Sequence, residues 1–312
     1  MKPEILQIAP MLPGVEAAFG EAYVVHRYWE APDRDALLAE AGPRIRGVAT
    51  SGHHGIAPAI MAALPKLEIV ASYGVGYDNI DTAACKARGV RATNTPDVLN
   101  DAVAELTLGL MLALCRRMVA ADRFVREGKW PAGDFELTGE LTGARAGILG
   151  LGRIGKEIAR RLQVMKMRVA YHGRHEQPYE PYKYYPDLEA MARDVDWLVV
   201  IAPGTAATRG IVSRRVLEAL GPKGAVVNVA RGALIDEPAM VELLAAGRLG
   251  GAALDVFADE PRVPEALFAL PNVVLSPHQG SATGKTRAAM GELVVRNLAA
   301  HFAGDPLLTP IA

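Results

Sequence analysis

The chain has 312 residues, 50% of them hydrophobic, which is enough for two cores of ordinary domain size. Its formal net charge of −1 provides no basic field that would attract nucleic acid or an anionic membrane. We therefore expect a small-molecule partner, with no nucleic acid and no membrane.

The cysteine content and the N-terminus predict a protein of the cytoplasm. Cys85 and Cys115 are too few and too far apart for a disulfide framework or a metal quartet, so no metal site is expected and a reducing compartment is favoured. The first residues lack a basic region followed by a long apolar segment, so no signal peptide is predicted. The most membrane-like segment, residues 106–115, is far shorter than the about 20 apolar residues of a membrane span and is expected to be a buried helix.

Short apolar segments alternate with helical ones in the first part of the chain. Strands are expected at residues 4–9, 47–50, 67–72 and 90–93, and this alternation predicts a parallel sheet covered by helices. A long helix is expected to run through residues 103–115, capped near Asn100 or Asp101. The polar residues 123–141 are expected to form an irregular arm or loop.

A glycine-rich run follows at Gly150-Leu151-Gly152-Arg153-Ile154-Gly155, after an apolar segment and before an amphipathic helical one. In a dinucleotide site the first glycine makes the tight turn, the second lets backbone approach a pyrophosphate, and the third allows helix and strand to pack closely. The N-terminus of the helix then faces the phosphates, which its free N–H groups and dipole favour. We expect the whole run to bind the cofactor.

The alternation of strands and helices restarts at residue 144. Strands are expected at residues 144–149, 168–171, 196–201, 224–229, 251–255 and 272–276, and their apolar character is typical of a parallel sheet buried on both faces. A closing helix is expected at residues 282–302, followed by Gly304.

These patterns predict an α/β fold with two doubly wound, parallel-sheet (Rossmann-like) domains. The dinucleotide-binding domain, residues 99–284, is expected to be inserted into a flavodoxin-like substrate-binding domain made of residues 1–98 and 285–312.

The residues after the second strand of this domain bear on the choice of cofactor. About 20 residues beyond the glycine run, an NAD site usually carries an acidic residue for the ribose 2′-hydroxyl. Here Gly173 and Arg174 stand at that place, and the nearest carboxylate, Glu176, lies beyond the expected turn. An arginine can clamp a 2′-phosphate, so NADPH is predicted to be preferred. NADH stays possible if Arg174 is only a solvated surface charge.

Three loops that follow strands of the second sheet carry residues suited to chemistry. They span residues 228–232, 255–261 and 276–281, and open α/β sheets place ligands at such strand ends. The loops supply a fixed cation, Arg231, a carboxylate, Glu260, and an imidazole, His278. This set suits the reduction of a 2-oxo acid while hydride arrives from a nicotinamide, so all three residues are predicted to be catalytic.

The glycine run and these three loops resemble the D-isomer-specific 2-hydroxyacid dehydrogenase family. The similar motifs are N-V-A-R-G-A-L-I-D from residue 228, G-A-A-L-D-V-F-x-x-E-P from residue 251 and S-P-H-x-G-S from residue 276. Residues 128–139 and 306–310 resemble the glyoxylate/hydroxypyruvate reductase branch, which also includes hydroxyphenylpyruvate and ketogluconate reductases.

The resemblance implies a role for each catalytic residue. His278 would be the general acid that protonates the substrate carbonyl oxygen, and Glu260 would hold the other ring nitrogen of that imidazole. Arg231 would bind the substrate carboxylate or carbonyl and stabilise oxyanion charge. Asp255 would hold the nicotinamide carboxamide. Further cofactor-binding residues implied by the resemblance are Ala202, Pro203, Thr208, Val229, Ala230 and Gly280.

The first domain is expected to contribute residues Tyr73, Gly74, Val75 and Gly76 to the binding of substrate, together with Arg231 and His278. The resemblance implies that backbone N–H groups of Val75 and Gly76 face the substrate carboxylate. His53 and His54 are candidates for lining the far end of the substrate.

The resemblance and the arm at residues 123–141 suggest a homodimer. Trp130, in that arm, is expected either to cover the substrate of the same or a neighbouring subunit or to pack in a core or interface. Two other functions stay open. One is a nucleotide-sensing corepressor, against which the absence of long disordered tails and of a basic patch argues, and the other is an NAD-dependent dehydrogenase working in the oxidative direction.

Overall fold

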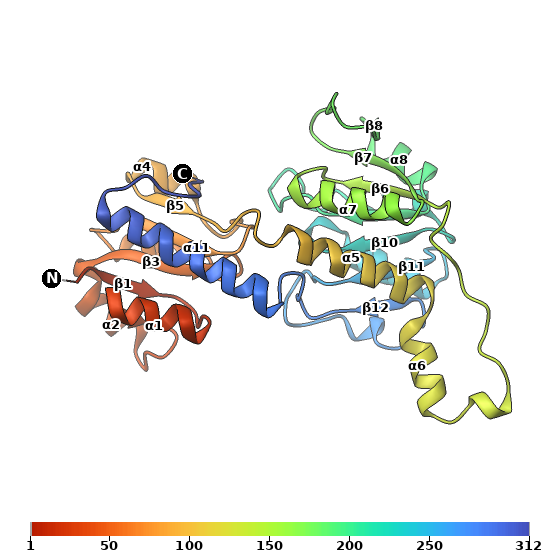
Figure 1. Cartoon of the computed structure of the whole chain (residues 1–312), viewed down its shortest axis with the longest axis horizontal. Helices are drawn as coiled ribbons and strands as arrows, with labels where there is room; N and C mark the ends of the chain where they lie inside the picture. The colour runs from red at the N-terminus through yellow and green to blue at the C-terminus, as the bar shows by residue number, and fades with distance from the viewer. Residues whose placement is uncertain (1, 312) are drawn as a thin grey trace. The chain divides into compact units, whose positions relative to one another are not determined.

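The computed structural model describes residues 2–311 and divides into two compact units (Figure 1). Among these residues, the first unit comprises 2–99 and 281–311, and the second comprises 100–280. The second unit is therefore a continuous segment that interrupts the first. The sequence predicted the first domain boundary after residue 98, one residue before the observed one. It predicted the second boundary after residue 284, four residues beyond the observed one.

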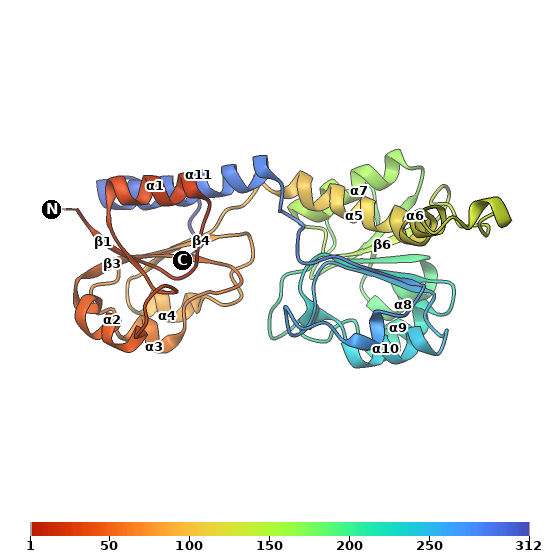
Figure 2. The same ribbon diagram turned by 90° about the horizontal axis from the view of Figure 1, so that it is seen from below.

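Within its described residues, the first unit contains one sheet of five parallel strands in the order β2-β1-β3-β4-β5. Figure 2 shows α1 and α11 on one face of this sheet and α2, α3 and α4 on the other. The strands are β1 (Glu4–Gln7), β2 (Val24–Arg27), β3 (Ile45–Ser51), β4 (Ile69–Tyr73) and β5 (Arg91–Thr93). The helices are α1 (Pro13–Ala22), α2 (Arg34–Ala41), α3 (Pro58–Ala62), α4 (Thr82–Ala87), α11 (Gly284–Ala303) and the short 3-10 helix η1 (Gly42–Arg44).

The closing helix α11 completes the core of the first unit although it comes from the end of the chain. Its N-terminus is capped by Thr283, whose hydroxyl accepts the backbone N–H of Thr286 at 3.1 Å. It ends at Ala303, and its C-cap is Gly304, which has a φ of 80°. The hydroxyl of Tyr73 donates to the backbone carbonyl of Arg287 at 2.8 Å, so the helix is tied to the end of β4.

The second unit, over residues 100–280, contains one sheet of seven parallel strands in the order β12-β11-β10-β9-β6-β7-β8. Figure 2 shows α5 and α7 on one face and α8, α9 and α10 on the other. The strands are β6 (Arg145–Leu149), β7 (Arg168–His172), β8 (Lys183–Tyr185), β9 (Trp197–Val200), β10 (Ala225–Asn228), β11 (Gly251–Leu254) and β12 (Val273–Leu275). The helices are α5 (Asn100–Cys115), α6 (Met118–Arg126), α7 (Arg153–Val164), α8 (Leu188–Asp194), α9 (Arg214–Leu220) and α10 (Glu237–Ala245), with 3-10 helices η2 (Trp130–Ala132), η3 (Gly232–Leu234) and η4 (Glu265–Leu267).

The predicted class of two parallel-sheet α/β domains is confirmed. The central strands β9, β10 and β11 are buried along their whole length, as expected for strands covered by helices on both faces. Among the helices of residues 2–311, none combines the length and apolar character needed to cross a membrane.

Two strands, β2 and β8, were not predicted from the sequence. Each lies at an edge of its sheet and pairs with one neighbour only. The residues of β2 are half-buried or exposed, and only the last residue of β8 is buried. Strands in this position need no continuous apolar run, so the pattern that identifies buried strands is missing from them.

Two further expectations for the second unit are wrong in part. The segment at residues 123–141 is irregular only beyond its beginning, because α6 extends to Arg126 and η2 follows at residues 130–132. Helix α5 is buried along one face only, and its last residues 112–115 are half-buried. The core of the single chain therefore covers only part of the apolar side chains of α5.

Candidate active site

The glycine run forms the turn between β6 and α7. Gly150 has a φ of +104°, and a Cβ there would lie 2.8 Å from the backbone nitrogen of Ala202. A Cβ on Gly155 would lie 2.2 Å from the carbonyl oxygen of Gly150, so both positions require glycine. Gly152, directly before α7, has no atom within 4 Å of its Cβ position. The open space at the helix N-terminus, where the first N–H groups lack helical partners, fits the pyrophosphate of a dinucleotide.

The segment after β7 carries the residues expected to select the cofactor. Nδ1 of His172 contacts the carbonyl oxygen of Tyr185 at 2.8 Å, so this ring is held by the neighbouring strand. The hydroxyl of Tyr184 donates to the carbonyl oxygen of Gly173 at 3.2 Å. Arg174 is exposed, and no acidic side chain among residues 2–311 pairs with it. The guanidinium therefore stands next to β7 without a carboxylate to neutralise it.

Other expected cofactor residues lie in loops at the carboxyl ends of neighbouring strands. Ala202 and Pro203 follow β9, and the hydroxyl of Thr208 donates to the carbonyl oxygen of Pro203 at 2.7 Å, which closes that loop. Val229 and Ala230 follow β10 and are buried. These strands are neighbours of β6 or of one another, so their ends meet at the same edge of the sheet as the glycine turn.

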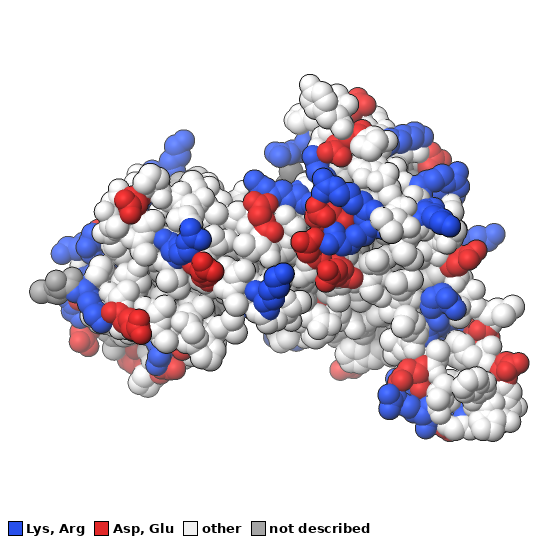
Figure 3. All heavy atoms as spheres, in the orientation of Figure 1, with Lys and Arg blue, Asp and Glu red and all other residues white. Residues whose placement is uncertain are grey.

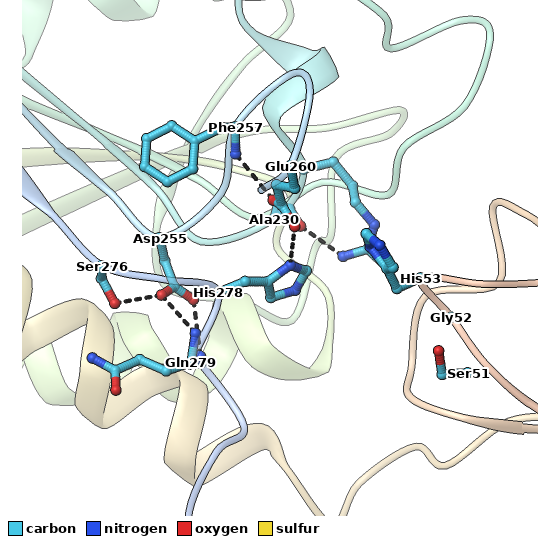
Figure 4. A network of polar contacts seen from close by, with 12 residues as sticks. Ser51, Gly52, His53, Ala230, Asp255, Phe257, Glu260, Ser276, His278 and Gln279 are labelled. Carbon is cyan, nitrogen blue, oxygen red and sulfur yellow. Dashed lines mark hydrogen bonds and ion pairs between the residues drawn. The ribbon is translucent and has the colours of Figure 1, made fainter. Parts of the chain in front are cut away.

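His278 and Glu260 form a hydrogen-bonded pair, although they are 18 residues apart in sequence. Nδ1 of His278 lies 2.6 Å from Oε2 of Glu260, and since a carboxylate only accepts, this nitrogen carries a hydrogen. The other oxygen of Glu260 accepts the backbone N–H of Phe257 at 3.0 Å. Figure 4 shows the imidazole pointing at the carboxylate. The His278 side chain is 41% exposed, so Nε2 is the nitrogen available to a ligand.

Asp255 holds the loop that carries His278. The carboxylate is buried, with 1% of the residue exposed. Its Oδ1 accepts the hydroxyl of Ser276 at 2.6 Å and the backbone N–H of Gln279 at 2.8 Å, and its Oδ2 accepts the backbone N–H of Gly280 at 2.9 Å (Figure 4). The backbone N–H of His278 donates to the Asp255 carbonyl oxygen at 2.8 Å. These four bonds hold His278 at a φ of +50°, a conformation that residues other than glycine rarely adopt.

Arg231 lies on a loop packed tightly against the one that carries Glu260. The side-chain amide of Asn228 donates to the carbonyl oxygen of Arg231 at 2.9 Å, and the Arg231 guanidinium donates to the carbonyl oxygen of Ala230 at 2.7 Å. A Cβ on the next residue, Gly232, would lie 1.9 Å from the carbonyl carbon of Phe257. Because β10, β11 and β12 are consecutive in the sheet, their loops bring the cation, carboxylate and imidazole to one edge.

The first unit presents the loop of residues 73–76 at the end of β4. The carbonyl oxygen of Gly74 accepts the N–H of Thr95 at 2.9 Å, and that of Val75 accepts the side-chain amide of Asn94 at 2.9 Å. In a planar trans peptide the N–H points away from the carbonyl oxygen, so these bonds turn the N–H groups of Val75 and Gly76 to the opposite side. Burial raises the pKa of the Tyr73 phenol, whose hydroxyl donates to a backbone carbonyl oxygen of α11.

His53 and His54 lie in the loop after β3 in the same unit. Nδ1 of His54 is 2.8 Å from the Ser51 hydroxyl, and the Asn79 amide donates to the carbonyl oxygen of His53 at 2.8 Å. Burial, followed by the charge of His53, lowers the pKa of the His54 imidazole. Within residues 2–311, no group of three or more His, Cys, Asp and Glu side chains is arranged to hold a metal ion.

The structure also reveals supporting residues that the sequence did not single out. Gln177 donates through its side-chain amide to the carbonyl oxygen of Leu151 in the glycine turn, at 2.8 Å. Glu237, at the start of α10, accepts the N–H of Ala258 beside the Glu260 loop at 3.0 Å. Neither residue lies in a recognisable motif, so no local sequence signal could have identified it.

Comparison with known proteins identifies the family. A family model described as "D-isomer specific 2-hydroxyacid dehydrogenase, NAD binding domain" matches residues 108–280. The chain belongs to the D-isomer specific 2-hydroxyacid dehydrogenase family. The predicted family and its oxidoreductase class are thereby confirmed, and the second unit is an NAD(P)-binding domain.

Named relatives extend over almost the whole chain. A glyoxylate/hydroxypyruvate reductase A from Arabidopsis thaliana is 48% identical over 307 residues, 98% of each chain. A 2-ketogluconate reductase from Gluconobacter oxydans is 40% identical over 310 residues, 99% of each chain. The crystal structure of an NADPH-dependent glyoxylate/hydroxypyruvate reductase from Sinorhizobium meliloti, in complex with NADP and malonate, is 44% identical. It superposes with a TM-score of 0.95 and covers 100% of this chain and 97% of that one.

Proposed function

We propose that this dehydrogenase reduces a small 2-oxo acid of the glyoxylate or hydroxypyruvate class to the D-2-hydroxy acid, with NADPH preferred over NADH. The single observation that carries the proposal is the His278–Glu260 pair, held by Asp255 at the same sheet edge as the glycine turn. The names of the relatives support the substrate class, because they are reductases of glyoxylate, hydroxypyruvate and 2-ketogluconate.

His278 is the proposed general acid. Glu260 engages Nδ1, so Nε2 is free to deliver a proton to the carbonyl oxygen of the substrate, and Glu260 stabilises the positive charge of the ring before transfer. Arg231 binds the substrate carboxylate or carbonyl and stabilises the negative charge that develops on oxygen. The N–H groups of Val75 and Gly76 bind the carboxylate, with Tyr73 and Gly74 shaping their loop. Bound NAD(P)H supplies the hydride to the carbonyl carbon.

The proposed cofactor site is built around the glycine turn. Backbone N–H groups at the start of α7 face the pyrophosphate. Oδ2 of Asp255 accepts one hydrogen bond within the protein and so retains capacity for the nicotinamide carboxamide. The remaining proposed contacts line the neighbouring strand ends. The residues are Gly150, Leu151, Gly152, Arg153, Ile154, Gly155, Gly173, Arg174, Ala202, Pro203, Thr208, Val229, Ala230, Asp255 and Gly280.

The proposal is tested by following nicotinamide absorbance with purified protein, NADPH or NADH, and glyoxylate or hydroxypyruvate. We expect turnover with both substrates and a higher kcat/KM for NADPH than for NADH. Absence of turnover with either cofactor across a wider set of 2-oxo acids would refute the reductase and favour a nucleotide-sensing protein.

Replacement of Arg174 by alanine tests the preference for NADPH. Charge-assisted hydrogen bonds to a phosphate contribute about 1.5–3 kcal/mol, so the ratio of kcat/KM for NADPH to that for NADH is expected to fall at least about tenfold. The measurement is steady-state kinetics at saturating glyoxylate with each cofactor. Arg193→Ala, which removes an exposed arginine of α8, is the matched control and should leave the ratio unchanged. An unchanged ratio in Arg174→Ala would show that this arginine is only a solvated charge.

We further propose that the protein is a homodimer formed through the apolar surface of α6 and the segment after it. This arm surface consists of exposed large apolar side chains, and Figure 1 shows the segment extending away from the sheet of the second unit. Several large apolar side chains exposed on one arm mark a candidate protein–protein contact. A second copy of the same chain is the simplest cover for it, because most oligomers pair identical surfaces. The arm-surface residues are Met118, Val119, Val125, Trp130 and Leu137.

Charged substitutions on the arm surface test the dimer. Light scattering coupled to gel filtration should give a dimer for the wild type. The double variant Val119→Glu/Leu137→Glu should raise the dimer dissociation constant at least about 100-fold, because each buried apolar side chain contributes about 1.5–3 kcal/mol. Tyr179→Glu, at a residue 99% exposed outside the arm, is the control. A monomeric wild type, or a double variant that stays dimeric, would contradict the proposal.

The proposed location is the cytoplasm, where both cysteines, which are free thiols in the structure, would stay reduced. The partner is a small molecule rather than nucleic acid. On the face shown in Figure 3, acidic and basic side chains alternate over α5 and α7 without a large area of one sign. Ion pairs such as Arg161–Asp101 contribute to this alternation.

A further inference from the structure

The segment between β7 and β8, residues 173–182, folds back onto the elements that precede it. The ammonium group of Lys156 on α7 pairs with Glu180 at 2.7 Å. The hydroxyl of Tyr182 donates to the side chain of Gln163 on α7 at 2.9 Å. This β7–β8 segment is therefore fixed along α7, the helix whose N-terminus faces the glycine turn.

Gln177 connects the β7–β8 segment to the glycine turn itself. Its backbone N–H donates to the phenol oxygen of the buried Tyr171 at 2.6 Å, which fixes the main chain of Gln177. Its side-chain amide donates to the carbonyl oxygen of Leu151 at 2.8 Å across 26 residues of sequence, in a half-buried position. A second bond, from the N–H of Gly150 to the carbonyl oxygen of His172 at 2.9 Å, joins the glycine turn to the last residue of β7, directly before the β7–β8 segment.

The acceptor of the Gln177 bond belongs to the peptide unit that carries the N–H of Gly152. A trans peptide is planar, and its carbonyl oxygen and its N–H point in opposite directions. A donor fixed on the carbonyl of Leu151 therefore fixes the direction of the Gly152 N–H, and it also polarises that group. Space beside Gly152 is open, since no atom apart from its chain neighbours lies within 4 Å of its Cβ position.

We propose that Gln177 is a positioning residue that orients the Gly152 N–H toward the pyrophosphate of the dinucleotide. The inference rests on the proposed function, because it assumes that the glycine turn binds NADP(H). The pyrophosphate is common to NADP and NAD. The loss of Gln177 should therefore weaken both cofactors by the same factor, whereas the loss of Arg174 should weaken NADP alone.

The test measures dissociation constants for NADP⁺ and NAD⁺ by isothermal titration calorimetry on the full-length protein, without substrate. Gln177→Met keeps the length of the side chain and removes its donor. We expect the dissociation constants of both nucleotides to rise about fivefold, the effect of losing one hydrogen bond, with their ratio unchanged. Tyr171→Phe, which removes the acceptor of the Gln177 N–H, should change both constants in the same direction by a smaller factor.

Gln163→Met is the matched control, because it removes a glutamine that holds the same segment at a distance from the turn. Its dissociation constants should equal those of the wild type. The proposal would be overturned if Gln177→Met bound both nucleotides with the dissociation constants of the wild type. A loss of affinity confined to NADP⁺ would also overturn it, because Gln177 would then act through Arg174. An equal loss of affinity in Gln163→Met would overturn it as well, because the effect would then come from a general loosening of the segment. If the wild type binds neither nucleotide, the proposed function fails, and this inference fails with it.

Discussion

Replacement of His278 by asparagine lowers kcat for the NADPH-dependent reduction of glyoxylate by about 10²- to 10⁴-fold, the range that general acid catalysis contributes. The variant removes the imidazole that is hydrogen-bonded to Glu260 and 41% exposed. Asparagine is chosen because position 278 has a φ of +50°, which asparagine tolerates better than alanine. The dissociation constant for NADPH should stay within about twofold of the wild-type value, because we assign this side chain to the substrate.

The measurement combines steady-state kinetics with a fluorescence titration of NADPH. His175→Asn, at an exposed histidine of the same unit, is the matched control and should keep wild-type kcat. A loss of less than tenfold in His278→Asn, with protein that still binds NADPH, would remove His278 from the mechanism.

Replacement of Arg231 by alanine lowers kcat/KM for glyoxylate by about 10²- to 10³-fold, as expected for the loss of one group that stabilises oxyanion charge. The guanidinium combines a permanent charge with a planar array of donors, which suits a carboxylate next to a carbonyl. Arg231→Lys keeps the charge without that array, so its kcat/KM should lie between those of alanine and wild type.

The readout is kcat/KM for glyoxylate and hydroxypyruvate in both variants, with the melting temperature as a check on folding. The check matters because the loop of Arg231 packs against the backbone of Phe257 through Gly232. A wild-type kcat/KM in Arg231→Ala would mean that another group binds the substrate. Equal values for lysine and alanine variants would mean that the planar donor array, and not the charge alone, is essential.

The sequence predicted every strand of both sheets except β2 and β8, which form one edge of each sheet. The residues of β9 and β10 are almost all apolar, because helices cover both faces of these strands, and this burial is visible in the sequence. Strands β2 and β8 have one neighbour each and are partly exposed. Local composition therefore does not separate them from loops.

Helix α6 was missed for a different reason. The prediction treated the segment as irregular because glycine and proline follow it at Gly128 and Pro131. The helix ends at Arg126, before these residues, and none of its side chains is buried in the single chain. Its apolar side chains are explained only if another surface covers them, as the proposed homodimer requires.

At the candidate site, the sequence by itself determined which residue types are present and at which strand ends they stand. The glycine run is a local motif. Gly150 must adopt a φ of +104°, and backbone atoms lie too close to Gly150 and Gly155 for either to carry a side chain. Arg231, Glu260 and His278 follow strands of one parallel sheet, whose carboxyl ends meet at a common edge. These features depend on neighbouring residues and on the strand order of a known fold, so they can be inferred without coordinates.

Only the tertiary structure decided how these groups are held. The carboxylate of Asp255 accepts a hydrogen bond from Ser276, 21 residues away, and Gln177 donates to Leu151 across 26 residues. Hydrogen bonds form within about 3 Å and depend on direction, so they require relative positions that no spacing along the chain encodes. The backbone conformation of His278 and the orientation of the Leu151–Gly152 peptide are therefore products of packing, although every residue involved is visible in the sequence.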